Sequence, residues 1–63
     1  MDDFKIGDRV RETSSGAMGT IEQTGVRVMA VGQLGQWDDN GVYLQLDDGP
    51  FMACERGFLE MAD

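Results

Sequence analysis

The stretch Val42-Tyr43-Leu44-Gln45-Leu46-Asp47-Asp48-Gly49-Pro50-Phe51 decides the fold class of this chain. Its first half has apolar residues at 42, 44 and 46 with Tyr43 and Gln45 between them, which is the period of a strand that buries one face. The segment 47–50 has the composition of a tight turn. We therefore expect residues 42–46 and 51–55 to form an antiparallel hairpin in an all-β domain.

Glycines recur every three to nine residues along the rest of the chain, so no window sustains the apolar spacing that a helix needs. The short runs between them are rich in Val, Ile, Thr, Tyr and Phe, a composition typical of strands. They predict further strands at residues 8–13, 20–24, 26–31 and 58–61, the last as a strand or a single helical turn. We expect Gly25 to mark a bulge or bend.

Residues 32–40 are polar and rich in glycine, and they read as a loop in which Leu34 and Trp37 are the large apolar side chains. Asn40-Gly41 adds a strong hairpin-turn signal. A chain of 63 residues is too short for two packed sheets, so we predict one domain spanning residues 1–63. A small barrel would protect the edges of its strands. The predicted fold is a five-stranded, partly open barrel with an enlarged loop or extended hairpin around residues 25–40. Its expected core is Phe4, Ile6, Val10, Ile21, Val28, Val42, Leu44, Leu46, Phe51, Ala53 and Leu59.

Two segments near the N-terminus carry a family resemblance. Ile6-Gly7-Asp8-Arg9-Val10-Arg11 and Gly16-Ala17-Met18-Gly19-Thr20-Ile21-Glu22 resemble the opening of Src-homology-3-like small barrels, and especially the KOW-type motif. That motif has a Gly-Asp entry turn, an alternating strand and a Gly-x-x-Gly re-entry. The resemblance implies a binding role. Such barrels bind RNA, ribosomal or transcription components, proline-rich peptides, methylated tails or another subunit.

The charge of the chain favours a protein partner over nucleic acid. Twelve carboxylates against five basic residues give a net charge of −7, whereas nucleic-acid binders normally carry a basic stripe. Arg9 and Arg11 share one strand face, so a local basic strip with Arg27 is the alternative reading. A minor alternative is that carboxylates line one face and imitate nucleic acid; these would be Asp2, Asp3, Asp38, Asp39, Asp47 and Asp48.

Catalytic and metal chemistry have little support in this composition. The chain has no histidine, so neither a Ser-His-Asp nor a Cys-His arrangement can form, and its one cysteine, Cys54, reads as a small buried hydrophobe. The acidic pairs 38–39 and 47–48 lie in expected loops or turns and lack the spacing of a calcium loop, which leaves at most a weak surface calcium site. We predict a non-catalytic protein with no cofactor and no metal.

The predicted binding residues are Trp37, Leu34 and Tyr43, joined by Arg9 and Arg11 if the partner is nucleic acid. Trp37 is singled out because tryptophan is enriched at the centres of protein interfaces. The competing interpretation is that Trp37 folds back and caps the barrel. The sequence starts without a basic and apolar leader, and a single cysteine suits a reducing compartment, so we expect a cytoplasmic protein without a membrane segment.

Overall fold

Five antiparallel strands form one sheet in the computed structural model, which describes residues 4–30 and 35–62. The strands are β1 (Arg9–Glu12), β2 (Met18–Met29), β3 (Trp37–Leu46), β4 (Phe51–Cys54) and β5 (Leu59–Met61). A 3-10 turn, η1 (Arg56–Phe58), joins β4 to β5, so the end of the chain is both a helical turn and a strand. Within the described residues no helix is long and apolar enough to cross a bilayer.

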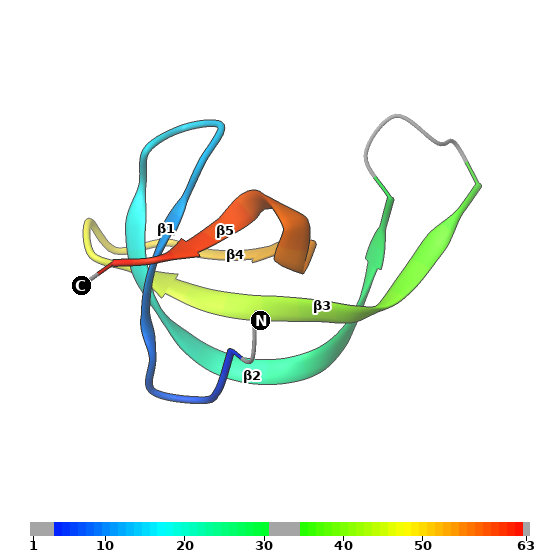
Figure 1. Ribbon diagram of the computed structural model, residues 1–63, viewed down its shortest axis with the longest axis horizontal. Helices are drawn as coiled ribbons and strands as arrows, with labels where there is room; N and C mark the ends of the chain where they lie inside the picture. Colours follow the sequence, from blue (N-terminus) through cyan, green and yellow to red (C-terminus); the bar gives the residue numbers. More distant parts are fainter. Residues whose placement is uncertain (1–3, 31–34, 63) are drawn as a thin grey trace.

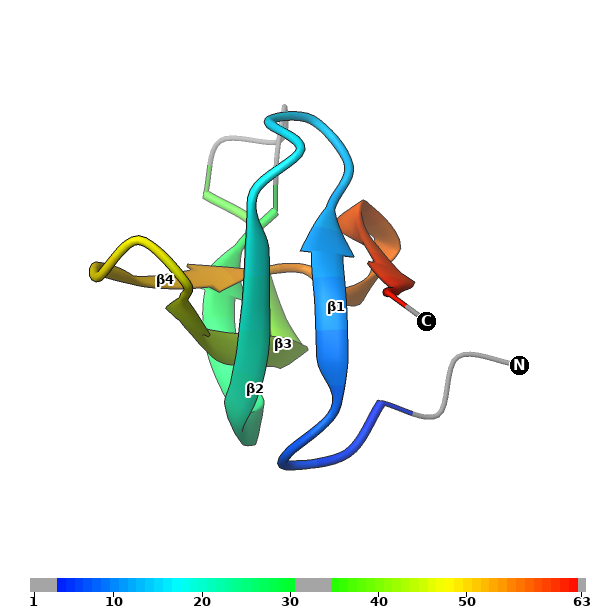
Figure 2. The same ribbon diagram turned by 90° about the vertical axis from the view of Figure 1, so that its left-hand side faces the viewer.

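The sheet has the order β4-β3-β2-β1-β5 and curls without closing. Figure 2 shows β4 running across the direction of β1 and β2, which lie side by side in front of it. This is the all-β, partly open barrel that the sequence predicted. The hairpin at 47–50 is also confirmed, because the Leu46 amide donates to the carbonyl oxygen of Pro50 (2.9 Å) and the Gly49 amide to that of Leu46 (3.1 Å).

The barrel core holds alternate residues from four strands together with Phe4 from the segment before β1. Its buried members are Phe4, Val10, Ile21, Val42, Leu44 and Leu59. Three side chains expected in the core are exposed: Ile6 (66%), Phe51 (52%) and Ala53. Ile6 lies in the entry turn, where the strand period does not apply. Phe51 and Ala53 pair with Gln45 and Tyr43, on the face of the β3–β4 pair that points away from the core.

The segment around residues 25–40, predicted as an enlarged loop or an extended hairpin, is an extended hairpin. β2 and β3 run on together past the ends of their other partners, and this end projects from the barrel in Figure 1. The sequence assignment of a loop to residues 32–40 was wrong from Trp37 onwards, because β3 begins there; residues 32–34 lie outside the described residues. Val26–Met29 and Trp37–Gly41 form a two-stranded ribbon, paired with each other but with neither β1 nor β4.

Two glycines explain how this long hairpin is built. Gly25 has φ +67° and lies at a register shift in β2, which confirms the predicted bulge. Asn40-Gly41 is not a turn, contrary to the sequence prediction, but lies inside β3. A Cβ atom on Gly41 would come within 2.7 Å of the Val26 carbonyl oxygen, so the strands approach here more closely than a side chain allows.

Candidate functional site

A groove of about 570 Å³ lies between the projecting hairpin and the β4–η1 segment. In Figure 1 the hairpin and η1 rise on either side of this region. The first wall comes from Arg27, Val28 and Met29 of β2 with Trp37 of β3, and the second from Phe58 of η1 with the β1–β2 loop. Met52, Ala53, Cys54 and Glu55 follow one another along the groove, and Glu12 and Ser14 complete the lining.

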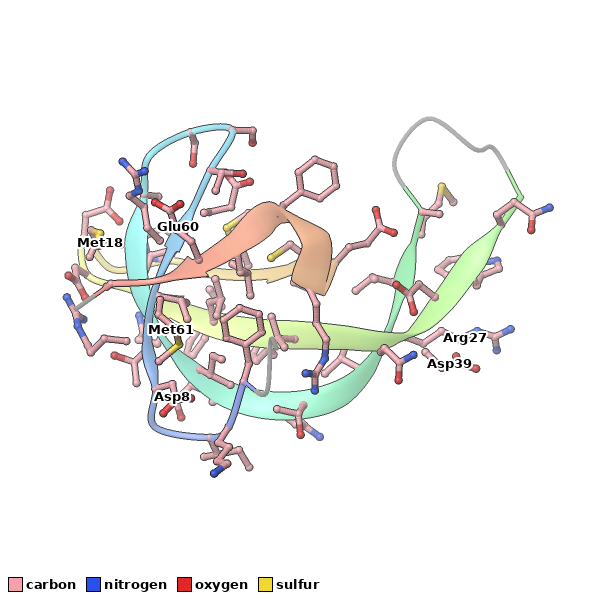
Figure 3. The ribbon with its side chains drawn as sticks, viewed as in Figure 1. Asp8, Met18, Arg27, Asp39, Glu60 and Met61 are labelled. Atoms are coloured by element: carbon pink, nitrogen blue, oxygen red, sulfur yellow. The ribbon has the colours of Figure 1, made fainter. Side chains whose placement is uncertain are left out.

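Two large apolar side chains of the groove are exposed. Trp37 is 53% exposed and Met29 is 48% exposed, and the two residues are paired across the β2–β3 hairpin. The guanidinium of Arg27 lies over the Trp37 ring, 5.6 Å from its centroid, and its Nε is 3.5 Å from Asp39 Oδ1. Figure 3 shows Arg27 and Asp39 beside each other on the hairpin. These contacts restrain an aromatic ring without removing it from solvent.

A buried carboxylate lies on the other side of the groove. Glu12 is 3% exposed, and its oxygens accept hydrogen bonds from the amides of Ser14 (3.1 Å) and Ser15 (2.8 Å). The hydroxyls of the same serines donate to it at 2.8 and 2.7 Å. These bonds, first from the hydroxyls of Ser15 and Ser14, lower the pKa of Glu12 from 4.5 to about 2. Glu12 is therefore an anion throughout the physiological range.

Cys54 is half-buried between the groove and the core. Burial raises the pKa of its thiol to about 11, with further contributions from the negative charges of Glu12 and Glu55. A protonated thiol is a poor nucleophile. The predicted reading of Cys54 as a small apolar group agrees with its packing against the core.

Of the predicted binding residues that the structure describes, Trp37 alone lines this groove. Leu34 lies outside the described residues. Tyr43 lies elsewhere on β3, where its ring stacks on Phe51 with centroids 5.2 Å apart. Sequence reasoning grouped Met29 with Met18, Met52 and Met61 as adaptable apolar side chains of a core or a contact face, and it missed Glu12 as a groove residue. The methionine content of the chain was the signal for Met29, whereas nothing in the strand pattern distinguished Glu12.

Arg9 and Arg11 each meet a carboxylate on a neighbouring element. Both terminal nitrogens of Arg9 donate to Asp47, at 2.6 and 2.7 Å, and these bonds hold the pKa of Asp47 below its usual value. Arg11 pairs with Glu60 of β5, which Figure 3 places at the far end of the molecule from Arg27. The three arginines of the suggested basic strip are thus neutralised locally and spread over the molecule.

The two described aspartate pairs do not form one cluster either. Asp38 and Asp39 lie at the start of β3, while Asp47 and Asp48 follow its end. At about 3.3 Å per residue, the ten-residue strand separates the two pairs by roughly 30 Å. Within residues 4–30 and 35–62, no group of three or more His, Cys, Asp or Glu residues could hold a metal ion.

A scan against protein-family models finds none that matches this chain, and neither a search of curated proteins nor a search of solved structures finds a match. Function is therefore inferred from the groove itself.

Proposed function

We propose that this protein is a non-catalytic binding module and that its groove receives a segment of a protein partner. The observation that carries the proposal is the pair Trp37 and Met29, two large side chains about half exposed on the wall of a 570 Å³ hollow. Tryptophan is enriched among the residues that dominate interface energies, and methionine adapts to the shape of an apolar partner. The lone cysteine suits a reducing interior, so we place this function in the cytoplasm.

Binding of nucleic acid is the weaker alternative. Binding of nucleic acid needs cationic side chains that can contact its phosphate groups. Arg9 and Arg11 are engaged by Asp47 and Glu60, and Arg27 is shared between Asp39 and the Trp37 ring. The distribution of Asp38, Asp39, Asp47 and Asp48 along β3 also gives no support to imitation of nucleic acid.

Selection from a displayed peptide library, with the whole chain as target, tests the proposal. Selected peptides should bind the wild type and lose affinity about tenfold or more for Trp37→Ala, because a central interface residue contributes about 2 kcal/mol. Met61→Ala is the matched control, since Met61 of β5 is exposed to nearly the same degree (51%) but lies outside the groove. Unchanged melting temperatures would show that both variants are folded.

Three results would overturn the proposal. The library could yield no binder, the selected peptides could bind Trp37→Ala as well as the wild type, or Trp37→Ala could unfold the chain. The last result would show that Trp37 supports the fold and not a contact with a partner. Short DNA and RNA oligonucleotides at low salt form the second arm, and salt-dependent binding to them would favour the nucleic-acid alternative.

A further inference from the structure

The hydrogen-bond pattern of the β3–β4 pair identifies an open strand edge beside the groove. Leu46 and Pro50 are a hydrogen-bonded pair, because the Leu46 amide donates to the Pro50 carbonyl oxygen. Opposed residues of an antiparallel pair alternate between bonded and non-bonded positions. With Gln45 opposite Phe51 and Tyr43 opposite Ala53, the main-chain groups of Phe51 and Ala53 point away from β3. In the described part of the chain, β4 pairs with no strand on that side.

This edge belongs to the same surface as the groove. Ala53 lines the groove together with Met52, Cys54 and Glu55, so a continuous stretch of backbone follows it. A partner in extended conformation could therefore pair with the main chain of Ala53 while one of its side chains reaches the Trp37 ring. Strand addition of this kind draws affinity from main-chain hydrogen bonds and selectivity from pockets for alternate side chains.

The other strand edges of the described chain are less suited to pairing. On the projecting part of β3, the Asn40 amide donates to Asp38 Oδ1 (2.8 Å), and the Asn40 carbonyl oxygen accepts from Arg56 Nε (3.0 Å). Register shifts interrupt the long β2 strand, and such irregularities discourage pairing. β5 has only three residues, and none of them lines the groove.

The charge of the groove and of the whole chain indicates what kind of segment would bind. Glu12 and Glu55 line the groove, while its one arginine, Arg27, is already paired with Asp39. The whole chain carries a net charge of −7, so a second copy would be repelled and a basic segment attracted.

We propose, on the basis of the proposed function, that the groove binds an extended basic segment of a partner protein, which adds as a strand to the β4 edge at Ala53. The segment alternates apolar and basic residues, so that its apolar side chains enter the groove beside Trp37 and Met29. Its basic side chains lie on the opposite face and are attracted by the net negative charge of the chain. Its main chain exchanges hydrogen bonds with the outward amide and carbonyl of Ala53.

A short blocked peptide of alternating lysine and valine is the probe. We expect it to change the fluorescence of Trp37, the one tryptophan of the chain, with an affinity that falls as salt rises. A peptide with glutamate in place of lysine should bind at least about tenfold more weakly. A lysine–valine peptide that is N-methylated at alternate amides keeps its charge but cannot form main-chain hydrogen bonds with β4. Its affinity should also fall about tenfold, which corresponds to the loss of about one or two hydrogen bonds.

Two measurements locate the bound strand on the protein. Amide exchange in the wild type should slow at Phe51 and Ala53 when the peptide binds. Ala53→Pro removes the outward amide and leaves the β3 ladder intact, whereas Ala53→Ser retains the amide. The proline variant should bind the peptide about tenfold more weakly than the serine variant does.

Equal binding of the acidic or the N-methylated peptide, or unchanged exchange at Ala53, would overturn this inference. The proposed function would survive that outcome if library peptides still depended on Trp37. A concentration-dependent dimer of the protein alone, with the Ala53 amide protected in it, would assign the edge to a second copy and would also refute the basic-segment proposal.

Discussion

Replacing Glu12 with glutamine should remove a large part of the stability of this small domain. A lowering of the pKa from 4.5 to about 2 corresponds to about 3 kcal/mol of preferential stabilisation of the ionised form. Each oxygen of the carboxylate accepts a backbone amide, from Ser14 on one side and Ser15 on the other. A glutamine turned either way places its NH2 group against one of these amides, which cannot reverse its polarity as a hydroxyl can.

We expect the free energy of unfolding of Glu12→Gln to be about 2–3 kcal/mol lower than that of the wild type at pH 7. A chain of 63 residues has a total stability of roughly 3–9 kcal/mol, so this loss is a major fraction of it. Urea unfolding of both proteins at a series of pH values measures the difference. Glu22→Gln, at an exposed position of β2, is the control and should change stability by less than about 0.5 kcal/mol.

The pH dependence of the stability difference distinguishes the effect of the charge of Glu12 from the effect of its shape. Because the folded-state pKa is depressed, the contribution of Glu12 is complete above about pH 4.5 and is lost as pH falls towards 2. The stability difference between wild type and Glu12→Gln should therefore be largest at neutral pH and shrink through this interval. A difference that is absent at pH 7, or that is constant from pH 7 to pH 2, would refute the reasoning.

Three further predictions concern the hairpin, the thiol and the outer face. Gly41→Ala should destabilise the protein by about 1–3 kcal/mol in urea unfolding, because its Cβ would lie 2.7 Å from a backbone oxygen. Gly57→Ala is the control and should be close to neutral, because nothing lies within 4 Å of the added Cβ. Equal effects of the two substitutions would contradict the close approach of the strands at Gly41. Cys54, with a pKa of about 11, should react with iodoacetamide far more slowly than free cysteine at pH 8 and should reach its normal rate in denaturant; a fast reaction in the folded protein would contradict the raised pKa. Phe51→Ala should cost no more than about 1.5 kcal/mol, the value of its exposed stack on Tyr43, and a larger loss in thermal unfolding would show that the stack supports the core.

The sequence by itself determined the fold class and most of the barrel core. Alternation at Val42 and Leu44 indicated which face is buried, because successive side chains of a strand point to opposite sides. The turn residues before Phe51 likewise located the β3–β4 hairpin, since their preferences act locally. For Phe51 itself the face assignment failed, because the register between two strands decides which residues share a face.

Only the tertiary structure decided the features on which the proposed site depends. Asn40-Gly41 has the local preference of a turn, yet it is held inside β3 by the long pairing with β2, where only a glycine fits. The burial of Glu12 depends on a loop that folds back over it. Trp37 and Cys54 line the same groove although they lie far apart in the chain. The curling of the sheet brings their two segments together, and no local pattern of residues encodes their approach.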